Sequence, residues 1–340
     1  MKLFAVVTSI QEPTESLRRL NIVMKELNST LLVIGDRKSP NNFTLEGCKF
    51  IGIERQSTLG LEAATKIPEN SYSRKMIGYL QALQSGADRI FETDDDNIPL
   101  ENFYDIQDFP KVCRVINSED TWINTYEYFT TVKIWPRGFP LENITGTDFK
   151  NSIATSSLKF EACVVQYLVD NDPDVDAIYR MTQSEKFPIT FEPGKTFVVP
   201  GDSYTPFNSQ STDWPIEFVE LMYLPSTCSF RMTDIWRSFI AQRIGREIGF
   251  HLIFRSPIMM QSRNEHVLHS DFSEEIEGYL NYNSIVSILN KTECLPGIDN
   301  IAQNLIRCYN ALIHFGIFHE TELEILDAYI RDIHQIRGTP

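Results

Sequence analysis

Short apolar runs alternate with helical patterns over the first hundred residues, and this alternation is the strongest constraint on the fold. The apolar runs are rich in β-branched residues and occupy residues 2–9, 31–35, 48–53 and 89–93. Between them, residues 15–27 and 73–85 carry apolar side chains at helical spacing. Strands that alternate with helices in this way form a mostly parallel sheet covered by helices. We therefore predict an α/β fold with a mostly parallel sheet flanked by helices.

The remainder of the chain predicts a less regular middle and a helical end. Residues 100–230 are richer in Pro, Gly and aromatic residues. A helix is expected from Met232, capped by Thr233 or Asp234, followed by a strand over residues 251–254. Further helical patterns cover residues 274–289, 298–315 and 320–336. A length of 340 residues suits one large domain with an appendage. We expect a main domain over residues 1–272 and a C-terminal helical extension over residues 273–340.

The charge balance excludes several classes of partner. The chain has 31 Lys and Arg against 46 Asp and Glu, a net charge of −15. Nucleic acids and anionic membranes require a basic surface, so we expect neither as a partner. No apolar run is long enough to cross a membrane, and the first residues are too weakly basic for a signal peptide. The six scattered cysteines include no CxxC pair, which indicates free thiols in a reducing compartment, and we expect a cytoplasmic protein.

Polar residues follow three of the predicted strands. Ser9, Asp36 and the run Asp94-Asp95-Asp96 stand where strands end, and ligands of parallel sheets bind beyond these carboxyl ends. Three adjacent carboxylates repel one another, and a divalent cation held by Asp94 and Asp96 would remove that cost. The alternative is a solvated acidic turn or a helix cap. We predict a metal site that binds a diphosphate.

Basic residues suggest where an anion could bind. Arg74 and Lys75 stand at a predicted helix start, where cations do not complement the helix dipole, so they suit a facing anion. A solvated basic pair is the alternative. Arg137 lies in a Pro-Arg-Gly turn between aromatic residues, which suits bidentate recognition of phosphate or carboxylate. For Arg137 a structural salt bridge is equally compatible with the sequence.

Three further positions are candidates from their place near predicted helices. Asp234, at a helix start, is a helix cap or a carboxylate base. One turn later, Arg237 could pair with it or touch substrate. His266 and His269 could share a helix face as metal ligands, although surface histidines are the simpler interpretation. The sequence has no GxGxxG and no GxxxxGK[ST], which argues against dehydrogenases and P-loop enzymes.

Several segments together resemble the STELLO family of glycosyltransferase-like proteins. They lie between residues 3 and 270 and read AVVTSIQEP, VIGDRKSP, SRKMIGYLQALQSGADRIFETDDDN, WPRGFPLENI, DPDVDAIYRMT and FRMTDIWRSFIAQR. The RGFP and DDD segments are also similar to the reversibly glycosylated polypeptides, which are UDP-arabinose mutases. The resemblance implies a GT-A-like fold, in which a Rossmann-type nucleotide half is fused to an acceptor half. Residues after about 274 lie outside it.

The resemblance also implies roles for particular residues. Asp94 and Asp96 would hold Mn²⁺ or Mg²⁺, with His266 or His269 as a further ligand. Asp234 and Arg137 would serve catalysis. Positions expected around the nucleoside and the diphosphate are Thr8, Asp36, Arg74, Lys75, Asp94, Asp95 and Arg237.

The expected activity is metal-dependent transfer of a sugar from a nucleotide-sugar donor, with UDP as the expected nucleotide. The acceptor would be a carbohydrate or glycoconjugate of unknown identity. One alternative is a UDP-sugar mutase, and another is a non-catalytic scaffold that keeps the glycosyltransferase fold. The C-terminal helices could form a homodimer.

Overall fold

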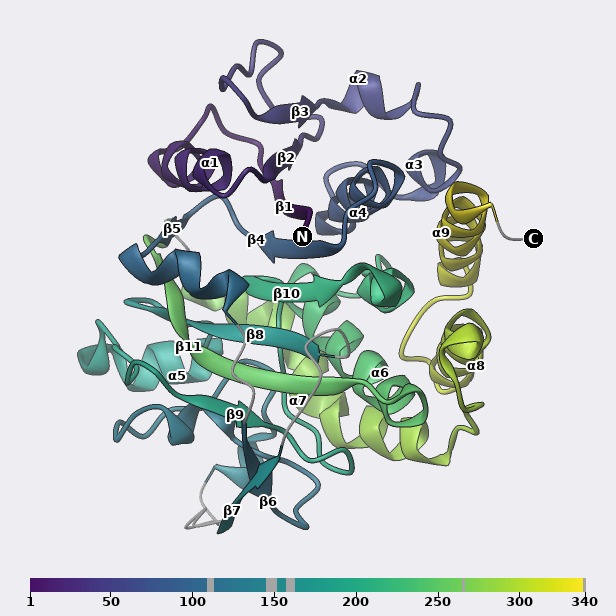
Figure 1. The fold of residues 1–340 in the computed structure, drawn as a ribbon. Helices are drawn as coiled ribbons and strands as arrows, with labels where there is room; N and C mark the ends of the chain where they lie inside the picture. The colour runs from purple at the N-terminus through teal and green to yellow at the C-terminus, as the bar shows by residue number, and fades with distance from the viewer. Residues whose placement is uncertain (109–112, 145–151, 157–162, 265–266, 339–340) are drawn as a thin grey trace.

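One mixed β-sheet with helices on both faces forms the centre of the molecule (Figure 1). A computed structural model describes residues 1–108, 113–144, 152–156, 163–264 and 267–338. Within these residues, eleven strands join one sheet: β1 Leu3–Thr8, β2 Thr30–Ile34, β3 Lys49–Ile51, β4 Arg89–Thr93, β5 Asn97–Pro99, β6 Cys113–Asn117, β7 Ser152–Ser156, β8 Cys163–Asp170, β9 Thr196–Val198, β10 Ser211–Pro215 and β11 His251–Gln261.

The helices of the described residues divide into short turns and longer packed elements. The α-helices are α1 Glu15–Glu26, α2 Ile53–Gln56, α3 Ala63–Lys66, α4 Lys75–Gln84, α5 Ala177–Thr182, α6 Thr233–Ile248, α7 Leu268–Lys291, α8 Ile301–His314 and α9 Glu322–Arg337. Short 3₁₀ helices also occur, among them η1 Tyr72–Arg74, η2 Glu101–Gln107 and η8 Phe230–Met232. None of the helices described is both long and apolar enough to span a lipid bilayer.

The strand order explains how the sheet divides. Strands β3, β2, β1 and β4 are neighbours and all run parallel. The sheet then continues through antiparallel β10 to β8, β11, β9, β6 and β7, where parallel and antiparallel pairs mix. The predicted α/β fold with flanking helices is confirmed, and the parallel pairing is continuous in its first half.

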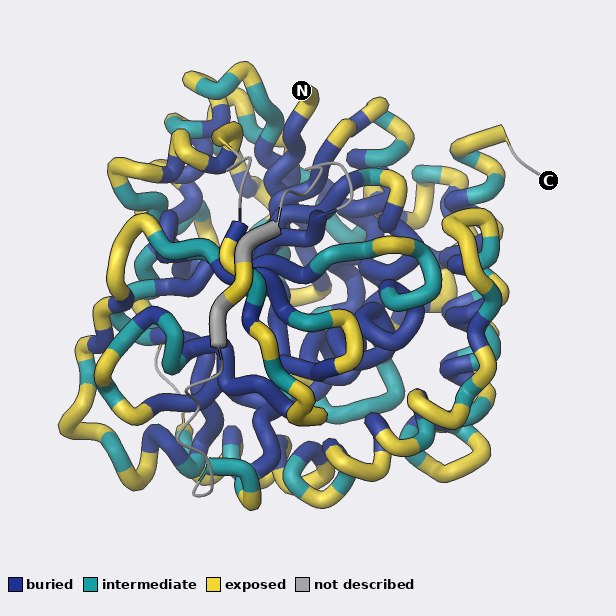
Figure 2. The backbone as a smooth tube through the Cα atoms, turned by 60° about the horizontal axis from the view of Figure 1, so that its bottom comes forward, coloured by how far each residue is buried: buried dark blue, intermediate teal, exposed yellow. Residues whose placement is uncertain are grey.

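Alternation along β1 separates two layers of core. Phe4 and Val6 pack into the cluster under α4, whereas Ala5 and Val7 pack into the cluster under α1. This period of two is what a strand covered on both faces requires. Figure 2 shows the result: buried backbone runs through the centre, and exposed residues follow the outer turns.

The C-terminal helices pack on the same core as the first half. Helix α9 lies against α3 and α4 (Figure 1), where the Asp332 carboxylate accepts hydrogen bonds from the backbone N–H groups of Glu62 (2.9 Å) and Ala63 (2.8 Å). Ile276 and Leu280 are exposed on α7. The domain division after residue 272 falls inside α7 and stays a prediction, as does a homodimer through these helices.

Gly78 allows α4 to approach the sheet, and its substitution tests this packing. A Cβ atom there would lie 2.4 Å from Val6 Cγ1 and 3.0 Å from Ile34 Cγ1. Alanine normally stabilises a helix interior over glycine by about 0.5–1 kcal/mol. We expect Gly78→Ala instead to lower the free energy of unfolding by about 1–3 kcal/mol through overpacking, measured by urea denaturation. Gly201→Ala is the control, because nothing lies within 4 Å of its added Cβ. Stabilisation by Gly78→Ala would contradict this packing.

Candidate functional site

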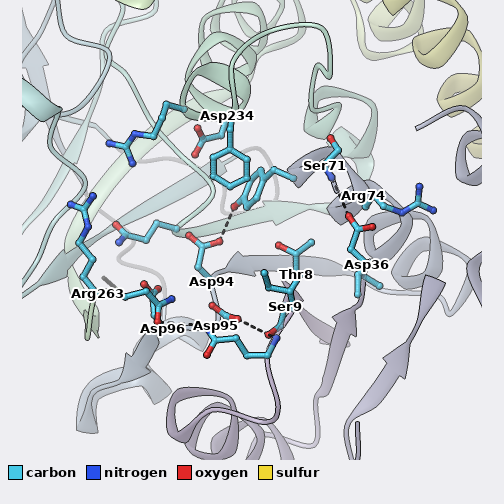
Figure 3. Close-up of a pocket in the computed structure, with 18 of the residues that line it drawn as sticks. Thr8, Ser9, Asp36, Ser71, Arg74, Asp94, Asp95, Asp96, Asp234 and Arg263 are labelled. Atoms are coloured by element: carbon cyan, nitrogen blue, oxygen red, sulfur yellow. Dashed lines mark hydrogen bonds between the residues drawn. The ribbon is translucent and has the colours of Figure 1, made fainter. Parts of the chain in front are cut away.

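A cavity of about 540 Å³ opens beyond the carboxyl ends of β1, β2 and β4 (Figure 3). Its lining comes from both halves of the sheet. The first half contributes Thr8, Ser9, Asp36, Ser71, Tyr72 and the acidic turn, which is Asp94, Asp95 and Asp96. The second half contributes Arg137, Asp174, Arg180, Arg231, Asp234 and Arg263. The predicted crevice at these strand ends is therefore present, and its volume is in the usual range for a ligand pocket.

The acidic turn is held by hydrogen bonds but carries little compensating charge. Asp94 Oδ1 accepts hydrogen bonds from Lys75 Nζ (3.0 Å) and Tyr72 Oη (2.8 Å). Asp95 accepts one from the hydroxyl of Ser9 at 2.5 Å. Lys75 is the one cation that forms an ion pair with this turn among the described residues. Three carboxylates with one ammonium group leave an excess of negative charge at the cavity floor.

Asp96 is the member of the acidic turn whose buried carboxylate has an oxygen without a partner. Its Oδ2 accepts a hydrogen bond from Gln261 Nε2 (3.0 Å), while its buried Oδ1 has no partner. Burial, and then the neighbouring Asp94 carboxylate, raise the pKa of Asp96 to about 7. Burial also raises the pKa of Asp95. An unpartnered buried carboxylate oxygen fits a hard divalent cation. The described residues hold no ready-made group of three His, Cys, Asp or Glu ligands, so further ligands would come from a bound molecule or water.

Arg137 lies in the cavity wall between two carboxylates. Its guanidinium makes a bidentate pair with Asp174, with both distances 2.8 Å, and contacts Asp234 at 3.2 and 3.3 Å. Burial alone would raise the pKa of Asp174, but the Arg137 charge lowers it to about 2. The structural salt bridge that the sequence left open is thus present, and direct contact of Arg137 with a ligand stays a prediction.

Asp234 points into the cavity from the first turn of α6 (Figure 3). Its Oδ2 also accepts hydrogen bonds from the N–H (3.1 Å) and the hydroxyl (3.2 Å) of Ser209. The prediction that Thr233 or Asp234 caps this helix is wrong. Met232 occupies the cap position without a side-chain hydrogen bond, because the Asp234 carboxylate is taken up by Arg137 and Ser209.

Arg74 and Lys75 are adjacent in sequence but diverge in space. The Arg74 guanidinium donates to the carbonyls of Ile67 (2.8 Å) and Ala64 (3.3 Å) and to the side chain of Gln56, and it turns away from the acidic turn (Figure 3). Lys75 is fully buried beneath Asp94. Both cations are thus bound to protein groups: Arg74 fixes the loop before α4 and Lys75 neutralises Asp94. Arg74 does line the cavity, and its contact with a ligand stays a prediction.

Arg237 does not line the cavity, which corrects its assignment as a nucleotide-binding residue. It is buried and forms an ion pair with Glu92, with N–O distances of 2.9 and 2.8 Å. Its guanidinium stacks near Trp214, 5.2 Å from the ring centroid. Although it lies one turn after Asp234 on the same helix, its side chain is buried in the core rather than in the cavity lining. His269 is exposed outside the cavity, and His266 lies outside the described residues.

Sequence reasoning identified Arg137 but missed three other arginines of the second half and an aromatic pair. Arg180, Arg231 and Arg263 line the cavity, but none of them directly follows a strand that the sequence predicted. Tyr72 and Phe230 meet edge to face at its rim, with ring centroids 5.3 Å apart. Arg180 and Arg231 do stand inside quoted motifs, DPDVDAIYRMT and FRMTDIWRSFIAQR, and this was the one available signal.

Comparisons with known proteins agree with the motifs. The family model described as STELLO glycosyltransferases matches residues 231–339. The chain is 28% identical over 300 residues to the probable glycosyltransferase STELLO2 of Arabidopsis thaliana, covering 84% of this chain and 38% of that protein. It is 26% identical over 344 residues to the probable glycosyltransferase STELLO1 of the same plant, covering 96% of this chain and 44% of that protein. The predicted similarity to the STELLO family is confirmed.

The similarity covers different parts of this chain and of its relatives. The STELLO match includes α7, α8 and α9, so the expectation that the resemblance ends near residue 270 is wrong. The chain spans less than half the length of the two plant proteins. Among solved structures, a mycobacterial protein is 12% identical with a TM-score of 0.42, covering 83% of this chain and 74% of that one. The glucosyl-3-phosphoglycerate synthase of M. tuberculosis is 11% identical with a TM-score of 0.39, covering 91% and 81%.

Asp96→Asn tests whether the ionised, buried Asp96 carboxylate destabilises the metal-free fold. The pKa of Asp96 rises from its ordinary value of 3.8 to about 7, so ionisation between these values destabilises the fold, and the penalty is complete above pH 7. We expect Asp96→Asn to raise the free energy of unfolding of the metal-free protein by about 1–3 kcal/mol at pH 8 and by less at pH 5. Urea denaturation in EDTA measures both, with Asp105→Asn on the exposed face of η2 as control. An equal effect at the two pH values would contradict the raised pKa of Asp96.

Proposed function

We propose that this chain is a metal-dependent glycosyltransferase that moves a sugar from a nucleotide-sugar donor to a carbohydrate or glycoconjugate acceptor. The observation that carries the proposal is the acidic turn at the end of β4, where Asp96 keeps a buried oxygen without a partner inside a cavity of about 540 Å³. A STELLO-type sequence gives the reaction class. The UDP identity of the donor rests on the resemblance of the RGFP and DDD segments alone.

The donor would lie across the strand ends, with its nucleoside on the first half of the sheet. Thr8 and Asp36 line this part of the cavity, and Asp36 is fixed there because its carboxylate accepts the N–H groups of Arg37 (2.7 Å) and Ser71 (3.0 Å). Asp94 and Asp96 would hold Mn²⁺ or Mg²⁺. When bound, the cation supplies neutralisation of the departing diphosphate, the charge that grows in the transition state.

The chain's own residues prepare this site for a cation. Lys75 and Tyr72 fix the position of Asp94, and Ser9 fixes that of Asp95. Gln261 holds only one oxygen of Asp96, which leaves the other available. A protein of net charge −15 has no general attraction for a diphosphate, so binding would depend on this local arrangement.

Metal-dependent binding of UDP is the direct test of the proposal. We expect calorimetric affinity for UDP to require Mn²⁺ and to fall at least about tenfold, or 1.4 kcal/mol, in Asp94→Ala and Asp96→Asn. Asp105→Asn, on η2 outside the cavity, should bind as the parent does. Equal affinity in EDTA would refute the metal requirement. Incubating a UDP-sugar without acceptor separates the alternatives, because a mutase interconverts ring forms whereas a transferase gives at most hydrolysis.

Asp234→Asn distinguishes a catalytic base from a residue that organises the cavity wall. Both Asp234 oxygens already accept hydrogen bonds, from Arg137 and Ser209, which favours the organising role. We therefore expect a lower melting temperature and weaker UDP binding, because the amide cannot replace a carboxylate paired with Arg137. A base would instead give parental melting and UDP binding, with transfer or donor hydrolysis slowed about 10²–10⁴-fold. The second pattern would return Asp234 to the catalytic role that the sequence suggested.

A further inference from the structure

Three arginines from separate parts of the second half line one region of the cavity. Arg180 comes from α5, Arg231 from η8, and Arg263 from the segment after β11. Their side chains are 8%, 12% and 10% exposed, so each guanidinium is largely removed from bulk water. We call these three residues the arginine wall.

The arginine wall is held by carboxylates that do not themselves line the cavity. Arg231 pairs with Glu275 at 2.6 Å, and Arg263 pairs with Asp271 at 2.8 Å. Arg180 pairs with Asp172, which also lies 3.9 Å from Arg263. Three cations are balanced by three anions overall, but only the cations are presented to the cavity. A ligand group at this part of the cavity therefore meets three guanidinium groups, although Asp174, Asp234 and the acidic turn line other parts of the same cavity.

Helix α7 fixes part of this wall rigidly. Glu275 is fully buried, and its carboxylate also accepts hydrogen bonds from the backbone N–H of Ala177 (2.8 Å) and the hydroxyl of Tyr279 (2.5 Å). A carboxylate held by this many donors keeps Arg231 in one orientation. A preoriented guanidinium fork is what bidentate recognition of phosphate or carboxylate requires.

The wall also has unused binding capacity. Arg180 Nε is buried and has no hydrogen-bond partner. Burial, and then the charges of Arg180 and Arg231, lower the pKa of Arg263 to about 10 despite its carboxylate partners. Repulsion among the three guanidiniums and an unmatched donor are both relieved by one bound anion.

The position of the wall separates it from the nucleoside end. Arg263 follows Gln261 and Ser262, which hydrogen-bond to the side chain and carbonyl of Asp96 at 3.0 Å each. Figure 3 shows Arg263 beside Asp96, on the side of the acidic turn opposite Thr8 and Asp36. An anion on the wall would thus lie beyond the metal site, next to the position where a transferred sugar meets its acceptor.

We propose that the arginine wall is a subsite for an anionic group, a phosphate or a carboxylate, carried by the acceptor. The inference rests on the proposed transferase function, because that function places the donor on the acidic turn. The acceptor is then an acidic sugar, a sugar phosphate or another small anionic hydroxyl compound rather than a neutral glycan.

Inorganic phosphate is the probe, titrated into the full-length chain saturated with UDP and Mg²⁺ and followed by thermal shift at constant ionic strength. We expect phosphate to raise the melting temperature of the UDP-loaded protein, and Arg180→Gln to weaken this response at least about tenfold while UDP affinity is unchanged. Arg263→Lys, which keeps the charge but loses the fork, should weaken it less and serves if Arg180→Gln does not fold. Arg55→Gln, exposed on α2, is the matched control.

Each other outcome overturns the subsite. If phosphate competes with UDP, or if Arg180→Gln lowers UDP affinity, the wall binds the donor diphosphate and the proposed transferase function stands without an acidic acceptor. If UDP binds but phosphate gives no response, the wall is structural only. If UDP and Mg²⁺ do not bind at all, the transferase proposal fails, and phosphate binding to the wall would then no longer mark an acceptor.

Discussion

The buried ion pair between Glu92 and Arg237 positions both sides of the cavity. Glu92 belongs to β4, two residues before Asp94, and Arg237 belongs to α6, one turn after Asp234. Glu92 also accepts a hydrogen bond from Trp214 Nε1 (2.8 Å). Removing one partner of such a pair leaves an uncompensated buried charge and typically costs about 3–5 kcal/mol. The pair therefore fixes the strand that ends in the acidic turn against the helix that begins at the opposite wall.

A hydrogen-bonded path joins the same two sides at the cavity surface. The Tyr72 hydroxyl donates to Asp94 and can accept from the hydroxyl of Ser209, whose backbone N–H donates to Asp234. Asp234 in turn pairs with Arg137. A change of charge at Asp94, such as the binding of a cation, would therefore alter the hydrogen bonding of Asp234 through the Tyr72 and Ser209 side chains. This path is a physical route by which a charge at the acidic turn would influence Asp234 and Arg137 on the opposite side of the cavity.

The sequence predicted the first half well because its signals are local. A buried strand followed by Asp94, Asp95 and Asp96 is readable within eight residues, and β4 has the expected bounds. The second half depends on partners distant in sequence. Arg137 and Arg237 both looked like ligand-binding residues, and only the position of Asp174 and Glu92 distinguishes a cavity-wall arginine from a core arginine. Strands β5, β6, β7, β9 and β10 were not predicted, and four of them, β6, β7, β9 and β10, lie in the part of the chain without the strand–helix alternation that marked the first hundred residues.

The C-terminal helices belong to the site as much as to the core. A boundary after residue 272 would pass through α7 between Asp271 and Glu275, and these two carboxylates hold Arg263 and Arg231. The region matched by the STELLO model, residues 231–339, contains all four residues together with Asp234, but not the acidic turn. The part of the chain that matches the STELLO model therefore contributes Arg231 and Arg263 of the arginine wall, whereas Arg180 and the acidic turn come from outside it. Helix α7 therefore fixes the orientation of the Arg231 and Arg263 guanidinium groups at the cavity through Glu275 and Asp271.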